Sequence, residues 1–244
     1  MKSVIAILII AILVILSTSA AGQSFAQKDS IGIDDFWYKY YSELRKRVGA
    51  EDIEKSVKSE FFRAWLNEVV LEVWRNESKL GGSLIHWVEE YIPDGEEATD
   101  RYFVVKDDLD SLTCVKILHV IDKFRIRKMP SSQYINGWEN GFDGIEYIIE
   151  DKIKNNYKFK NYWTPSVQVN VPEADILEKF IKELMIVVNE KERSKYFYAS
   201  IPFHSWMNGG ATIASRVVTH GEAMRMKQER NRYRRLKKKH LLVK

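Results

Sequence analysis

The sequence is poor in cysteine and lacks the short motifs that mark several common enzyme classes. Cys114 is the only cysteine, which excludes an intramolecular disulfide and any metal site built from several cysteine ligands. The glycine patterns that hold phosphates or dinucleotides are absent, as are Gly-x-Ser-x-Gly and His-Glu-x-x-His. NTPases, Rossmann enzymes, typical esterases and zinc proteases are therefore disfavoured.

Long apolar runs are also scarce. The one such run, Val4 to Leu16, has 13 residues, whereas a membrane span needs about 20. It follows Lys2 and precedes small and polar residues, which is the order of a signal peptide. We expect residues 1–26 to be cleaved before Gln27, so that the protein is exported, either periplasmic or secreted. The alternative is an uncleaved inner-membrane anchor formed by residues 4–26.

Composition and charge divide the rest of the chain into two parts. The 244 residues are 45% hydrophobic and 30% charged, as in globular proteins. From Arg225 to Lys244 there are ten basic residues and one acidic residue, a formal charge of +9. The part from Gln27 to Met224 carries a charge of −6. We expect one α+β domain over 27–221 and a basic tail over 222–244.

The tail is predicted to be helical, because residues 222–239 contain no glycine or proline. Such a cluster of bases attracts anionic lipid, an envelope polymer or an acidic protein partner, whereas an exported protein rarely meets nucleic acid. The alternative is a solvated helix without a partner. The candidate residues for binding an anionic surface are Arg230, Arg232, Arg234, Arg235, Lys237, Lys238 and Lys239.

Hydrophobic periodicity predicts helices first and strands later in the chain. The expected helices cover 34–47 (with Gly49 as the stop), 51–76, 83–91 and 172–189. The expected strands cover 102–105, 113–120, 124–127 and 196–201, with a hairpin over 142–163. This order indicates an α+β fold with N-terminal helices, a mainly antiparallel sheet, a packing helix at 172–189 and a basic C-terminal helix.

The hairpin carries a partial resemblance. Gly141-Phe142-Asp143-Gly144 opens a strand with Tyr147 and Glu150, the return strand ends at Trp163-Thr164-Pro165, and an apolar helix follows. Residues 141–190 resemble an uncharacterised class of exported bacterial α+β proteins. In that class a tryptophan is usual at the position of Tyr147, and a histidine is common in the return strand. The resemblance implies export and a hairpin followed by a helix, but no activity.

Four residues are weak candidates for catalysis: Asp143, Glu146, Glu150 and His204. They motivate an alternative function, an envelope hydrolase. Glu146 and Glu150 share a face of the predicted strand about 13 Å apart, which is too far for a carboxylate dyad. A hydrolase would need all four side chains to converge on one cleft within about 10 Å. We therefore favour a non-catalytic envelope binding or structural protein, with a membrane-anchored partner protein as a third possibility.

No cofactor or metal is expected. His86 with Glu89 or Glu90 has a spacing that would suit a weak metal site on a helix, but no third ligand is evident. Trp138 lies in a polar loop and is the best candidate for an exposed aromatic residue.

Overall fold

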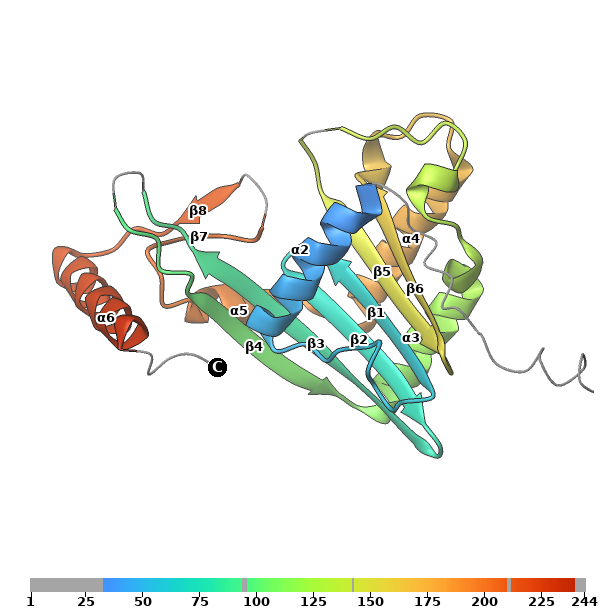
Figure 1. Ribbon diagram of the computed structural model, residues 1–244, viewed down its shortest axis with the longest axis horizontal. Coiled ribbons are helices and arrows are strands. Elements are labelled where there is room, and N and C mark those ends of the chain that lie inside the picture. Colours follow the sequence, from blue (N-terminus) through green and yellow to red (C-terminus); the bar gives the residue numbers. More distant parts are fainter. Residues whose placement is uncertain (1–32, 94–95, 142, 210–211, 240–244) are drawn as a thin grey trace, which may run out of the picture.

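The computed structural model describes residues 33–93, 96–141, 143–209 and 212–239 (Figure 1). The predicted signal peptide lies outside these residues. The helices are α2 (Ile33–Val48), α3 (Ser111–Lys123), α4 (Pro172–Val187), α5 (Glu190–Ser200) and α6 (His220–Lys238). The strands are β1 (Glu60–Leu66), β2 (Val69–Asn76), β3 (Lys79–Glu90), β4 (Tyr102–Leu109), β5 (Glu146–Ile153), β6 (Asn156–Trp163), β7 (Ser205–Met207) and β8 (Ile213–Ser215). The α+β prediction is confirmed.

All strand pairs of the sheet that the structure describes are antiparallel. The order is β6-β5-β1-β2-β3-β7-β8, and β4 pairs with β3. The β5–β6 hairpin therefore lies beside β1, although about 80 residues separate β1 from β5 in the sequence. The two short strands β7 and β8 extend the sheet at the far end of β3.

Helices cover both faces of the sheet (Figure 1). On one face, α3 and α4 bury Ile117 and Phe180 against strand residues such as Leu71. On the other face, α2 buries Leu44 against Trp65 and neighbouring strand residues. The result is a layer of strands between two layers of helix, with a hydrophobic core on each side.

Four elements agree closely with the sequence patterns. The first helix is α2, and Gly49 follows it with a φ of +68°, a conformation that suits glycine. The hairpin is β5–β6, the packing helix is α4, and the basic tail forms α6. The strand predicted at 102–105 is the first half of β4.

The helices predicted at 51–76 and 83–91 are wrong, because these segments form β1, β2 and β3. Both faces of the central strands are buried, so apolar residues follow one another without the alternation of a half-exposed strand. An unbroken apolar run also fits helical spacing. The turn between β1 and β2 is Asn67-Glu68, where Asn67 has a φ of 62°. Asparagine tolerates that conformation, so Asn67 was the sequence signal for a turn that the helix prediction overlooked.

Three predicted strands are also wrong. Residues 113–120 belong to α3, residues 124–127 form a turn leading into a short 3₁₀ helix, and residues 196–200 belong to α5. In α3, the Asp110 side chain accepts a hydrogen bond from the Thr113 backbone N–H at 2.9 Å. This N-cap, together with a buried face over Cys114, Ile117 and Ile121, outweighs the β-branched composition.

Gly82 is a position where the sheet leaves no room for a side chain. A Cβ atom there would lie 2.5 Å from the backbone oxygen of Glu72 and 3.0 Å from the Cys114 sulfur. Gly82→Ala should lower the free energy of unfolding by about 1–3 kcal/mol, because the backbone cannot move aside. Gly221→Ala is the matched control, since nothing lies within 4 Å of its Cβ. Chemical denaturation measures both, and equal stabilities would contradict the prediction.

Candidate functional site

The basic tail forms helix α6, and its N-terminus is stabilised by a capping box. The Thr219 hydroxyl accepts a hydrogen bond from the Glu222 backbone N–H at 3.3 Å, and the Glu222 carboxylate accepts one from the Thr219 backbone N–H at 2.8 Å. This reciprocal cap satisfies two backbone donors. The backbone hydrogen bond from Thr219 also lowers the pKa of Glu222. The helix therefore begins for a local reason, although none of its residues is buried.

One face of α6 lies against an acidic loop of the same chain. Arg230 and Arg234 approach Glu96 at 3.7 Å and 3.9 Å. Lys237 pairs with Asp100 at 2.5 Å, and Lys238 approaches Glu97 at 3.8 Å. The hydrogen bond between Lys237 and Asp100 lowers the pKa of Asp100 and raises that of Lys237. We call these four basic residues the docked set: Arg230, Arg234, Lys237 and Lys238.

The attachment of α6 is mostly electrostatic. The Arg101 guanidinium lies 5.6 Å from the centre of the Tyr233 ring, which adds a cation–π contact. Ion pairs that remain accessible to solvent contribute only about 0–1 kcal/mol each. Salt screens them, since the Debye length is about 8 Å at physiological ionic strength. The helix is therefore held on the domain by weak, salt-sensitive contacts.

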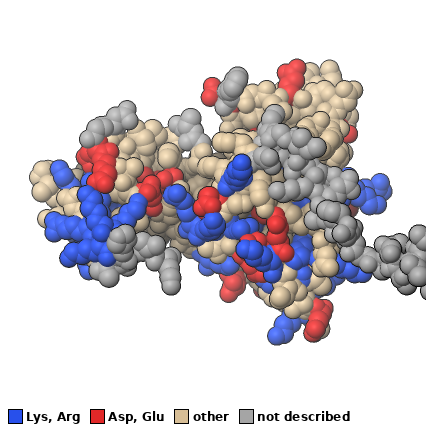
Figure 2. Space-filling model, in the orientation of Figure 1, with Lys and Arg blue, Asp and Glu red and all other residues tan. Residues whose placement is uncertain are grey.

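The opposite face of α6 carries bases without an ion-pair partner among the residues described. At about 100° per residue, four basic residues fall within a sector of roughly 80° that points away from the docked set. All four are exposed, and Figure 2 shows Lys and Arg side chains gathered over α6. We call them the outward stripe: Arg225, Arg232, Arg235 and Lys239.

The sequence therefore located the basic face only in part. Of the seven predicted residues, Arg232, Arg235 and Lys239 belong to the outward stripe and the other four form the docked set. Arg225 was counted in the charge of the tail but not among the candidates. The acidic loop, with Glu96, Glu97 and Asp100, was missed, although two adjacent glutamates in an otherwise polar loop were its visible signal.

The four candidate catalytic residues do not line one cavity in the part of the chain that the structure describes. Glu146 lines a pocket beneath α2, and Asp143 is exposed in the turn before β5. His204 lines a different cavity, beside α6. Glu150 shares the strand face of Glu146, as predicted, but it is buried in an ion-pair cluster. Among the described residues, these four do not form one carboxylate site of the kind that the hydrolase hypothesis needs.

That cluster is built around Arg63, whose side chain is 0% exposed. Its guanidinium donates to Glu150 at 2.8 Å and to Glu72 at 2.9 Å. Burial alone would lower the pKa of Arg63, but the two carboxylates outweigh it and the pKa is raised. Trp65 and Tyr157 donate to Glu150 at 2.7 Å and 2.8 Å. Burial and the charge of Glu150 raise the pKa of Tyr157, so its hydroxyl stays protonated and donates.

The spacing of His86 and Glu89 or Glu90 would suit a metal only on a helix, and these residues lie on strand β3. His86 and Glu89 face opposite sides of β3, and Glu90 lies about 13 Å further along it. The His86 ring is buried 5.2 Å from that of Phe197. Among the described residues there is no group of three or more potential metal ligands.

Trp138 is half-buried against Tyr162, at 5.7 Å between ring centres, so its prediction as an exposed aromatic is wrong.

Comparison with known proteins finds no matching family model, no similar curated protein and no similar solved structure. The resemblance of residues 141–190 to exported bacterial proteins stays a prediction. Within the described part of the chain, no helix is long and apolar enough to cross a membrane.

Proposed function

We propose that this protein is an exported, non-catalytic envelope protein that binds an anionic surface through the outward stripe of α6. The observation that carries the proposal is the division of the helix into two basic faces. On one face, four bases are paired with Glu96, Glu97 and Asp100, while the other presents four exposed bases. Each base near an anionic membrane adds about 1 kcal/mol of attraction.

The chemistry of α6 favours adsorption over insertion. An interfacial helix that inserts needs a broad apolar face, and the apolar Met226 and Tyr233 lie on the side turned toward the domain. The side opposite the docked set is mainly basic, with the exposed Met224 at its edge. We therefore expect binding to anionic lipid, with polar contacts only and a strong dependence on salt. An envelope polymer with repeated phosphates or carboxylates would present the same charge.

The test is sedimentation with vesicles of phosphatidylcholine mixed with phosphatidylglycerol, compared with pure phosphatidylcholine. Two chains are compared, 27–244 and 27–224, so that the apolar run 4–16 does not itself bind lipid. The longer chain should bind more when phosphatidylglycerol is present, and physiological salt should weaken that gain. The shorter chain should show no gain. An equal gain of both chains from phosphatidylglycerol would remove the proposal.

The proposed compartment needs its own measurement. Mass analysis of the N-terminus combined with cell fractionation distinguishes the three possibilities for residues 1–26. A chain beginning at Gln27 outside the cytoplasm supports export, and an intact N-terminus in the inner membrane supports an anchored partner protein. A full-length chain in the cytosol contradicts both.

A further inference from the structure

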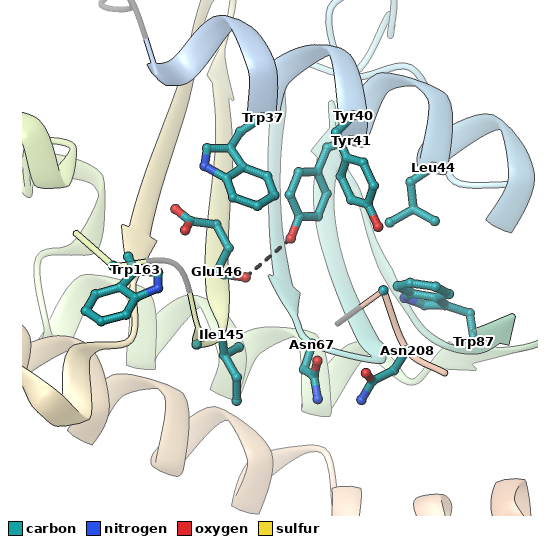
Figure 3. A pocket seen from close by; sticks show the side chains of 13 residues that line it. Trp37, Tyr40, Tyr41, Leu44, Asn67, Trp87, Ile145, Glu146, Trp163 and Asn208 are labelled. Atoms are coloured by element: carbon teal, nitrogen blue, oxygen red, sulfur yellow. Dashed lines mark hydrogen bonds between the residues drawn. The ribbon is translucent and has the colours of Figure 1, made fainter. Parts of the chain in front are cut away.

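An aromatic pocket lies between α2 and the sheet, apart from α6 (Figure 3). Its wall comes from α2, the β1–β2 turn, β3, the segment before β5, the end of β6 and the loop after β7. The pocket has a volume of about 100 Å³. Five aromatic side chains line it: Trp37, Tyr40, Tyr41, Trp87 and Trp163.

The rings that α2 contributes meet nearly at right angles. The planes of Trp37 and Tyr40 differ by 89°, and those of Tyr40 and Tyr41 by 83°. Gly209 has a φ of 88°, and a Cβ there would lie 2.9 Å from the Tyr40 hydroxyl. The loop can approach this closely only because it has glycine at that position. Rings set as adjoining walls give an enclosed group several π faces at once.

Among the described residues that line the pocket, Glu146 is the only charged one. Its side chain extends toward the space between Trp37 and Trp163 (Figure 3). The Tyr41 hydroxyl donates to the Glu146 carbonyl at 3.3 Å, which fixes the strand beneath the helix. No lysine or arginine stands among the lining residues that the structure describes, so this part of the pocket disfavours an anion.

Each of the two amides at the floor of the pocket donates one hydrogen bond. Asn67 and Asn208 both donate to the carboxylate of Glu68, at 2.6 Å and 2.7 Å. Their amide groups point away from α2 in Figure 3. A sugar ring needs several donors and acceptors around its hydroxyls, and each amide has one of its two N–H donors already engaged by Glu68. The pocket offers aromatic faces and carboxylate charge, and its lining residue Trp87 has a buried indole N–H without a hydrogen-bond partner among the described residues.

The surroundings add negative charge. Glu68 lies behind the two amides, and the charge of Glu89 reaches Tyr40. Burial and Glu89 raise the pKa of Tyr40, against the opposing charge of Arg47. Burial raises the pKa of Tyr41 as well, with smaller contributions from Tyr40 and Glu146. Both phenols therefore stay neutral near pH 7 and present π faces to an enclosed group.

We propose that this pocket binds a small organic cation, with a methylated ammonium head group enclosed by the Trp37, Tyr40 and Tyr41 rings and its charge balanced by Glu146. The small volume of the pocket suits a small head group, since about 100 Å³ is well below the roughly 300 Å³ or more of pockets that hold drug-sized ligands. A quaternary ammonium over aromatic faces gains cation–π attraction that a neutral group of equal shape lacks.

The test is calorimetric titration of the chain 27–244 with choline and with 3,3-dimethyl-1-butanol, which has the same shape without the charge. Choline should bind at least about tenfold more tightly than the neutral compound. Glu146→Gln should weaken choline binding about tenfold, because it removes the charge and keeps the shape. Phosphatidylcholine vesicles, tested in parallel, distinguish a lipid head group from free choline as the source of the cation.

Trp37→Leu and Phe36→Leu form the matched pair of helix variants. Trp37 lines the pocket, whereas the neighbouring Phe36 is 63% exposed and does not. Trp37→Leu should weaken choline binding and Phe36→Leu should leave it unchanged, with both chains showing the unaltered circular dichroism of a folded protein. Absence of choline binding overturns the proposal, and so does equal affinity for the neutral compound or preferential binding of glucose. Deletion of residues 225–244 tests independence from α6, and choline binding should persist.

Discussion

Replacing Arg63 with methionine should lower the free energy of unfolding by about 3–5 kcal/mol. Arg63 is fully buried between Glu72 and Glu150, which are 2% and 4% exposed. The substitution keeps much of the side-chain volume but leaves two carboxylates without their buried counter-charge. Lys106 approaches Glu72 only at 3.6 Å, so it does not replace the guanidinium. Urea denaturation followed by tryptophan fluorescence measures the loss.

Two further variants make this prediction specific to the buried pairs. Lys123→Met removes one partner of an exposed pair with Glu183, at 2.6 Å, and should change stability by less than about 1 kcal/mol. The triple variant Arg63→Met, Glu72→Leu, Glu150→Leu should recover part of the loss, because it removes the buried charges together. Equal effects of Arg63→Met and Lys123→Met would show that the buried carboxylates find other compensation.

The segments that the sequence predicted correctly are those whose patterns are set locally. In α4, Pro172 lies at the first turn and Leu177, Phe180 and Leu184 recur on one buried face. The β5–β6 hairpin joins two strands of eight residues across a tight turn at Lys154. Each element can be read from a window of about twenty residues: α4 has one buried face, and the hairpin is marked by the turn between its two strands, although the middle of each strand is buried on both faces.

The segments that the sequence predicted wrongly are those whose structure depends on residues distant in the sequence. β1 lies between β2 and β5, and its side chains are covered by α2 on one face and by α3 and α4 on the other. No window of sequence contains that information. The consequence reaches the site, because Arg63 was placed in a helix and its pairing with Glu150, 87 residues away, was not foreseen.

The two candidate sites differ in the same way. The bases of α6 are contiguous in the sequence, so a count of charges found them, although not the acidic loop that pairs with four of them. The aromatic pocket draws on segments from residue 37 to residue 209. Of its lining residues, only Glu146 was a candidate, for catalysis. The aromatic residues of α2 were predicted only as part of a helix, since nothing in the sequence places Trp163 or Gly209 beside them.

Converting the outward stripe to glutamine should weaken binding to phosphatidylglycerol-containing vesicles about a thousandfold at low salt, since four bases at about 1 kcal/mol each are lost. The variant is Arg225→Gln, Arg232→Gln, Arg235→Gln, Lys239→Gln. Glutamine keeps the helical propensity, so α6 should still form. Vesicle sedimentation over a range of lipid concentrations gives the affinity, and circular dichroism confirms the helix.

The matched control converts the docked set instead, so that the same number of positive charges is removed. Its substitutions are Arg230→Gln, Arg234→Gln, Lys237→Gln and Lys238→Gln. These bases already face Glu96, Glu97 and Asp100, so a membrane gains from them only by displacing those acids. The control should therefore lose much less affinity than the stripe variant, although its net charge is identical. Equal losses would mean that binding follows total charge alone. A larger loss in the docked set would mean that α6 leaves the acidic loop and turns that face to the membrane.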